Sequence, residues 1–211
     1  VRFTRAYVTN PSCCPSRVSL LTGRYSHTTG VWANAGPHGG FASFDDADII
    51  ATRLDDAGYR TGLFGKYLNG YDPGSDYVPP GWDSWLAGAG EYYFDYTLLD
   101  ATDGRGDLVT FGDDPSDYST RVLTRRAQTF LSSTPAHTPF LAVVAYHAPH
   151  PPATPDPRDA DASVHLAAHR PPASGQGARH RAPALRRARR RAREGRPAPG
   201  PQAREPHARR P

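Results

Sequence analysis

The composition of the chain changes abruptly near residue 170, and this break limits what the chain can fold into. Residues 1–169 contain every Phe, Tyr, Trp and Ile. Beyond them the only large aliphatic residue is Leu185, which stands among Arg, Ala, Pro and Gly. Such a segment cannot bury enough apolar surface to offset the entropy of ordering it. The length and composition therefore predict a folded part large enough for one domain, followed by a disordered tail.

The two parts also differ in charge. Residues 1–169 have 11 Arg and 1 Lys against 19 acidic residues, a net charge of −7, whereas residues 170–211 have 13 Arg against 2 acidic residues, a net charge of +11. A tail of this kind could bind phosphate backbones or anionic glycans without specificity. Because no aromatic residues are interleaved with the arginines, we expect no specific nucleic-acid partner. An anion-binding protein that uses this tail stays open as an alternative function.

The chain begins at Val1 without the charged and apolar segments of a signal peptide, so its start looks internal and the sequence leaves export open. No apolar run approaches the length of a membrane span, and we expect none.

The only two cysteines are adjacent, in the stretch NPSCCPSRVSLLTGR at residues 10–24. Cys13 and Cys14 cannot easily form a disulfide with each other, and they provide no CxxC pair for zinc. The Pro-Ser that follows, the apolar residues after it and Gly23 predict a short helix that opens at Cys13. A thiol at a helix N-terminus is favoured in its anionic form, although most free cysteines are small buried apolar residues.

The rest of the folded part alternates between helical and extended patterns. We expect a helix capped at Asp45 or Asp46 with Ile49, Ile50 and Leu54 on its inner face, and a Gly58 stop. A strand should follow over residues 59–64, then a long irregular excursion over 72–114 with room for short strands. After it we expect a helix over 116–133 and an apolar strand from residue 139 that ends in a loop rich in His and Pro. In the helix over 116–133, the residues that should face inward are Val122, Leu123, Ala127 and either Phe130 or Leu131.

This order predicts an α/β fold with a parallel or mixed sheet covered by helices. Ligands of such sheets bind at the carboxyl ends of the strands. Lys66, the only lysine in the chain, and the pair His147 and His150 follow two of these strands. They are therefore candidate site residues.

Cys13-x-Pro-Ser-Arg17, followed by Leu-Thr-Gly-Arg, resembles the signature of the type I sulfatases. The blocks AGYRTGLFGKYLNGY, VPPGWDSW, YYFDYTL and PFLAVVAYHAPHPP look like successive parts of the N-acetylglucosamine-6-sulfatase branch. The resemblance implies an alkaline-phosphatase-like sulfatase fold with a mixed, mainly parallel sheet and helices on both faces. It covers residues 1–155 as a partial catalytic domain, and leaves 156–211 as a disordered tail or a stretch read out of frame.

In this family the first cysteine of the signature is oxidised by a separate formylglycine-generating enzyme, so the resemblance makes Cys13 the precursor of formylglycine. The hydrated aldehyde would attack the sulfur of a sulfate ester through one hydroxyl, and its second hydroxyl would then expel sulfate. The implied substrates are sulfated glycans, with 6-sulfated N-acetylglucosamine units first, or aryl sulfates. Relatives that act on phosphorus esters make a phosphatase or phosphonate hydrolase a subordinate alternative.

The resemblance also assigns roles to other residues. Arg17 would hold the diol and the charge near it, Lys66 would bind the sulfate oxygens, and His150 would contact the sulfate or protonate the departing alcohol. Asn69 stands close to the position where many sulfatases have a histidine, and could take part of its work. His147 is either a supporting residue or an ordinary loop residue. The aromatic residues Trp82, Trp85, Tyr92, Tyr93 and Tyr96 would form either a sugar-stacking wall or part of the core.

The sequence departs from the family at the metal site. The family's calcium ion is bound by formylglycine, here position 13, and by an early Asp-Asp pair and a late Asp-Asn or Asp-His pair. Asp45-Asp46 and Asp55-Asp56 do not match the early pair, and the arginine tail stands where the late pair should follow. The hypothesis is an incomplete sulfatase, and a catalytically inactive fragment is the alternative. Glycan-degrading relatives imply a secreted or periplasmic protein.

Overall fold

The structure is a computed structural model that describes residues 2, 4–90, 92–102 and 105–159. The predicted disordered tail lies almost entirely outside these residues. The described residues belong to one unit, Val1–Val164. Its helices and strands, in chain order, are α1 (Cys13–Thr22), α2 (Ser26–Thr29), α3 (Ile50–Asp56), β1 (Arg60–Lys66), β2 (Ser84–Gly88), β3 (Tyr96–Thr102), β4 (Arg105–Phe111), α4 (Ser119–Ser133) and β5 (Phe140–Ala145). Short 3-10 helices occur at η1 (Phe41–Ser43), η2 (Pro73–Ser75), η3 (Pro115–Asp117) and η4 (Pro157–Asp159).

The strands form one five-stranded sheet in the order β4-β3-β2-β1-β5. β1 is parallel to both β2 and β5, whereas β3 is antiparallel to β2 and β4. The expected mixed sheet is thus confirmed. The excursion over 72–114, where short strands were the most that was expected, contains β2, β3 and β4, and these extend the same sheet. Side chains of β2 and β3 are buried on both faces of the sheet, which removes the alternation that identifies a strand in a sequence.

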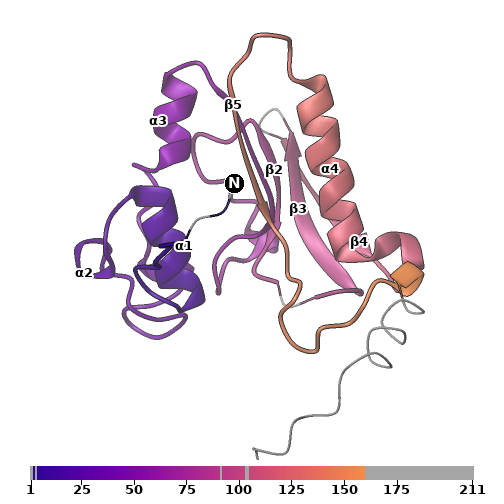
Figure 1. Cartoon of the computed structure of the whole chain (residues 1–211), viewed down its shortest axis with the longest axis horizontal. Helices are drawn as coiled ribbons and strands as arrows, with labels where there is room; N and C mark the ends of the chain where they lie inside the picture. Colours follow the sequence, from indigo (N-terminus) through magenta and orange to yellow (C-terminus); the bar gives the residue numbers. More distant parts are fainter. Residues whose placement is uncertain (1, 3, 91, 103–104, 160–211) are drawn as a thin grey trace, which may run out of the picture. The chain divides into compact units, whose positions relative to one another are not determined.

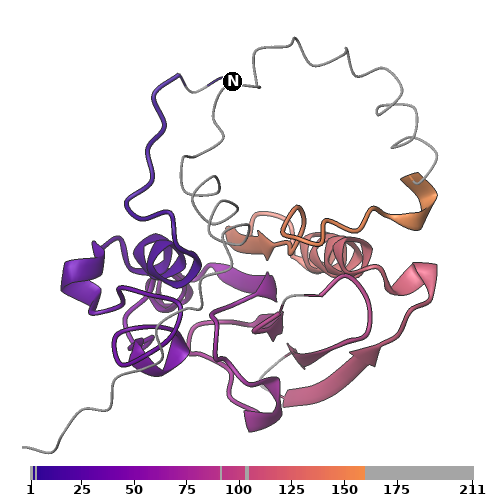
Figure 2. The same cartoon turned by 90° about the horizontal axis from the view of Figure 1, so that it is seen from below.

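The side chains of the central strands alternate between two apolar clusters. Leu63 and Trp85 belong to the cluster that contains Val18 of α1, whereas Phe64 and Leu86 belong to the cluster built on α4. Figures 1 and 2 show α1 and α3 on one side of the sheet and α4 on the other. Helices on both faces are therefore confirmed.

Helix α3 begins later than predicted. It starts at Ile50 rather than at Asp45 or Asp46, with Ile49 as its N-cap residue. Asp46 is buried and accepts hydrogen bonds from two tyrosine hydroxyls instead, so it cannot cap the helix. As a result Ile50 is exposed and Ala51 takes the buried position. Leu54 is only partly buried.

α4 and β5 follow the prediction more closely. Val122, Leu123, Ala127 and Phe130 of α4 are buried, while Leu131 is 43% exposed. The apolar strand β5 pairs with β1 in parallel register, from Arg60 opposite Phe140 onwards. It is the last strand of the described sheet, so it is only partly buried. Within the described part of the chain, no helix has the length and apolar character needed to cross a membrane.

Candidate active site

The predicted nucleophile position opens α1. Cys13 is its first residue and is a partly buried free thiol, whereas Cys14 is fully buried. The N-cap residue Ser12 makes no side-chain cap. Its place is taken by Asn34, whose Oδ1 accepts hydrogen bonds from the Cys14 backbone N–H at 2.8 Å and from Ser12 Oγ at 3.2 Å. Sequence reasoning missed Asn34, since a cap supplied from 20 residues away leaves no local pattern.

The structure brings Arg17 and Lys66 together beside this helix end. Arg17 lies one turn after Cys13, and its Nη1 donates to the Lys66 carbonyl at 2.8 Å. Burial lowers the pKa of the Arg17 guanidinium, while Cys13, Cys14 and Tyr92 raise it. Lys66 ends β1, is only 5% exposed, and pairs with Gly88 at the end of β2. Two cations thus lie at a helix N-terminus, an arrangement that favours a bound anion.

Cys14 connects α1 to the segment after β1. Its Sγ accepts a hydrogen bond from the Asn69 N–H at 3.2 Å and donates to Asn69 Oδ1 at 3.4 Å. Burial raises the pKa of the Cys14 thiol, opposed by the Asn69 hydrogen bond and by the charges of Lys66 and Arg17. The thiol therefore stays protonated and serves as a structural group.

Three segments are linked by these contacts, residues 12–17, 33–41 and 66–69, and we call the arrangement the site brace. The Asn34 side chain accepts a hydrogen bond from the first turn of α1. Phe41 N donates to the Asn69 carbonyl at 2.8 Å, and the Asn69 N–H donates to Cys14 Sγ. Gly40 lies within the brace at φ 69°, and a Cβ there would lie 2.8 Å from the Asn69 carbonyl oxygen. The brace fixes the position of Cys13 relative to Lys66.

The two predicted histidines lie in the loop after β5. His147 is buried, and its ring lies 4.7 Å from that of Tyr93 and 4.9 Å from that of His150. His150 is exposed, and its carbonyl accepts a hydrogen bond from the Tyr93 hydroxyl at 2.7 Å. The ring of Tyr92 also lies 6.1 Å from His147. These aromatic contacts place the histidine loop at the carboxyl end of the sheet, where Lys66 lies.

Most aromatic residues of the proposed stacking wall belong to the core. Trp82, Trp85, Tyr93 and Tyr96 are at most 8% exposed. Their rings are covered by other side chains and cannot stack on a sugar. Tyr92 differs, because it is partly buried and interacts electrostatically with Arg17.

The described carboxylates do not fit the calcium site that the family implies. Asp46 accepts hydrogen bonds from the Tyr67 and Tyr77 hydroxyls, and Asp45 accepts from the Ala47 N–H. Within residues 2, 4–90, 92–102 and 105–159, no three His, Cys, Asp or Glu side chains are grouped so that they could hold a metal. We therefore derive no step through a metal ion.

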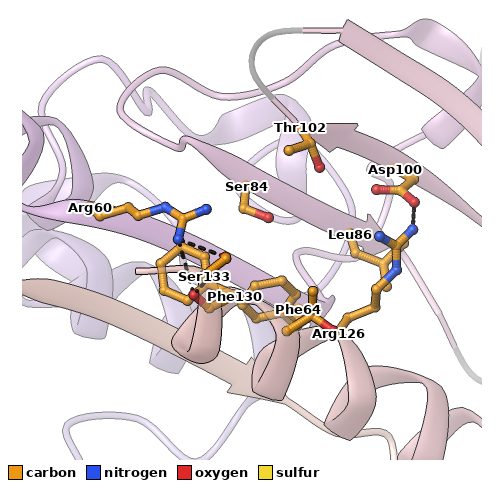
Figure 3. A pocket seen from close by; sticks show the side chains of 10 residues that line it. Arg60, Phe64, Ser84, Leu86, Asp100, Thr102, Arg126, Phe130 and Ser133 are labelled. Atoms are coloured by element: carbon orange, nitrogen blue, oxygen red, sulfur yellow. Dashed lines mark hydrogen bonds and ion pairs between the residues drawn. The ribbon is translucent and has the colours of Figure 1, made fainter. Parts of the chain in front are cut away.

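A separate pocket lies between α4 and the sheet, at the end where β1 and β2 begin (Figure 3). Its charged groups have structural partners. Arg60 Nη1 donates to the Phe130 carbonyl at 3.0 Å and to Ser133 Oγ at 2.9 Å, which satisfies the C-terminus of α4. Arg126 forms an ion pair with Asp100 of β3. This pocket is therefore a feature of helix packing, distant in the sheet from the strand ends that carry Lys66 and Gly88.

Comparison with known proteins agrees with this geometry. The family model described as Sulfatase matches residues 1–174. The chain belongs to the sulfatase family.

Individual relatives come from animals and bacteria. The chain is 37% identical over 175 residues to the putative extracellular sulfatase Sulf-1 homolog of Caenorhabditis elegans, covering 80% of this chain and 24% of that protein. It is 36% identical over 168 residues to the human N-acetylglucosamine-6-sulfatase, covering 74% of this chain and 30% of that protein. The chain thus spans less than a third of the length of either relative.

The solved structures give the same fold. The structure of BT4656 in complex with its substrate D-glucosamine-2-N,6-O-disulfate has a TM-score of 0.62 and 28% identity, covering 82% of this chain and 32% of that one. The putative sulfatase yidJ from Bacteroides fragilis has a TM-score of 0.56 at 23% identity, covering 83% of this chain and 43% of that one. The predicted sulfatase fold, present in part, is confirmed.

Proposed function

We propose that residues 1–155 are the part of a sulfatase catalytic domain that carries the nucleophile, and that the whole protein hydrolyses sulfate esters. The observation that carries the proposal is the hydrogen bond from Arg17 to the carbonyl of Lys66, beside Cys13 at the start of α1. It brings the Arg17 side chain to the end of β1 where Lys66 stands, and the charges of both residues act on Cys14, next to the residue that the family signature marks. Formylglycine at position 13 would supply a hydrated aldehyde that attacks sulfur.

The side chains around position 13 support specific roles. The partly buried charge of Arg17 favours an anion at the first turn of α1, and Lys66 adds a second positive charge. Histidine is a common general acid, and His150 is exposed to an arriving substrate, so we assign it to the departing alcohol. The side-chain Oδ1 and the backbone N–H of Asn69 both form hydrogen bonds with Cys14 Sγ. The side-chain Nδ2 is then the group that would donate to a substrate oxygen. His147 supports the position of His150.

The substrate we propose is a glycan with 6-sulfated glucosamine units. Two relatives support this choice: the human relative is an N-acetylglucosamine-6-sulfatase, and BT4656 was solved with a 6-O-sulfated glucosamine. The C. elegans relative is described as extracellular, and we propose that the whole protein is secreted or periplasmic. Its maturation would need a formylglycine-generating enzyme, and its calcium ion would need ligands beyond those described.

The experiment is to produce the chain together with an enzyme that oxidises Cys13, label aldehydes with a hydrazide probe, and measure sulfate release from an aryl sulfate. We expect labelling of the wild-type chain and none of Cys13→Ala, and sulfate release only from a form of the protein that also supplies the missing metal ligands. Cys14→Ala is the matched control, which should keep the label. An aldehyde without turnover would identify an inactive fragment. Faster turnover of the matched aryl phosphate would identify a phosphoesterase.

A further inference from the structure

Tyr92 has a rigidly held ring next to the candidate site. Its ring stacks on Tyr96 with 4.6 Å between centroids and lies 6.1 Å from the His147 ring. The backbone of Gly90 lies directly against it, since a Cβ on Gly90 would be 1.5 Å from the Tyr92 Cε1 atom. The ring is thus occupied by protein contacts. What Tyr92 can offer to a ligand is its hydroxyl group.

This hydroxyl is buried and has no hydrogen-bond partner in the described part of the chain. The neighbouring tyrosines differ, because the Tyr93 hydroxyl donates to the His150 carbonyl at 2.7 Å and the Tyr96 hydroxyl donates to the Asp117 carbonyl at 2.8 Å. Burying a hydroxyl without a partner costs free energy, so such groups in native proteins need an explanation. An oxygen of a bound ligand would supply the partner that the Tyr92 hydroxyl lacks.

The hydroxyl lies at the strand ends that form the candidate site. A Cβ on Gly88 would be 3.3 Å from the Tyr92 hydroxyl oxygen, and Gly88 is the register partner of Lys66. Burial raises the pKa of Tyr92, with a smaller opposing effect from the Arg17 charge. The group therefore stays a neutral O–H donor throughout the physiological pH range. One such donor beside two cations suits an anion with several acceptor oxygens.

We propose that Tyr92 is a substrate-contact residue whose hydroxyl donates a hydrogen bond to an oxygen of the sulfate group held by Arg17 and Lys66. This inference rests on the proposed function and adds a residue to it. It replaces the sugar-stacking role with a hydrogen-bonding role, because the ring is already packed and the hydroxyl is not paired.

The test is thermal unfolding of the full chain titrated with inorganic sulfate, against chloride at equal ionic strength. Without sulfate, Tyr92→Phe should raise Tm, because it removes a buried unpaired group while keeping the ring. With sulfate, it should weaken binding about tenfold, the effect of one hydrogen bond to a charged group. Tyr96→Phe is the matched control: it loses a satisfied hydrogen bond, so it should lower Tm and bind sulfate as the wild type does.

The outcomes separate this inference from the proposed function. If the wild type responds to sulfate, Arg17→Gln loses the response and Tyr92→Phe keeps it in full, the role of Tyr92 is overturned while the anion site stands. If the wild type gives no saturable response to sulfate, both the anion site and the role of Tyr92 are contradicted.

Discussion

Asn34 caps a helix to which it does not belong. Its side-chain oxygen accepts from the Cys14 N–H and from Ser12 Oγ, so the first turn of α1 depends on a loop 20 residues further along the chain. An N-cap acceptor satisfies a backbone N–H that has no partner within the helix. The orientation of Cys13 therefore depends on a residue without any catalytic chemistry of its own.

Replacing Asn34 by Ala should lower the free energy of unfolding by about 1 kcal/mol, the usual effect of losing a cap. Asn34→Asp keeps an acceptor oxygen near the positive end of the helix dipole and should retain most of the stability. Urea unfolding of the two variants and the wild type measures the difference. Equal losses in both variants would contradict the capping role.

The two adjacent thiols should react at different rates. Cys14 is buried, and its pKa is raised above the ordinary value of 9.0, so in the folded chain it is both inaccessible and protonated. Iodoacetamide should alkylate Cys13 well before Cys14. Mass spectrometry measures the two rates separately, because the Cys14→Ala variant retains only Cys13 and the Cys13→Ala variant retains only Cys14. In denaturant the difference should disappear. Equal rates in the folded protein would show that Cys14 is not buried as described.

At the scale of elements, the sequence pattern predicted those whose signals are local. α1 ends at Gly23 in the left-handed conformation, with φ 68°, as its glycine suggested. The excursion over 72–114 was expected to hold short strands at most and was not assigned to the sheet, because β2 and β3 are buried on both faces and so lack the alternation of a typical strand. Of the candidate site residues, Cys13 and Arg17 follow from the signature, and Lys66 from its position after a strand. Asn34 does not follow from the sequence, since it acts through a contact across the fold, and neither does the hydroxyl role proposed for Tyr92.

The inner face of α4 gives a direct test of the packing. Phe130 is 3% exposed, and its ring lies 5.5 Å from that of Phe64 and 4.6 Å below the Arg60 guanidinium. Phe130→Ala should cost about 3 to 5 kcal/mol, because it removes a buried ring and leaves a cavity. Leu131→Ala, at the adjacent exposed position, should cost less than about 1 kcal/mol. Chemical denaturation compares them, and similar losses would contradict the orientation of the helix.

At the scale of the whole molecule, buried phenol groups should set the limit of alkaline stability. Burial is the largest cause of a raised pKa at five buried or partly buried tyrosines: Tyr67, Tyr71, Tyr92, Tyr96 and Tyr118. For Tyr71 the pKa rises from 10.0 to about 12. The unfolded chain releases these protons first, so the free energy of unfolding must fall as the pH rises above 10.0.

We expect phenolate absorbance from these residues to appear together with the loss of far-UV circular dichroism during an alkaline titration. The urea-unfolded chain is the control, and its tyrosines should ionise around their ordinary pKa. Ionisation of most tyrosines in a chain that keeps its native spectrum would contradict their burial.

The long-range hydrogen bonds of the site also imply an order of folding. Thr97 and Thr110 of the β3–β4 hairpin are 13 residues apart, whereas Arg17 and Lys66 are 49 apart and Cys14 and Asn69 are 55 apart. Contacts between distant residues must overcome a larger loop-closure entropy, so they form more slowly than local ones. The hairpin should therefore form early, and the contacts around Cys13 should be assembled among the last in the molecule.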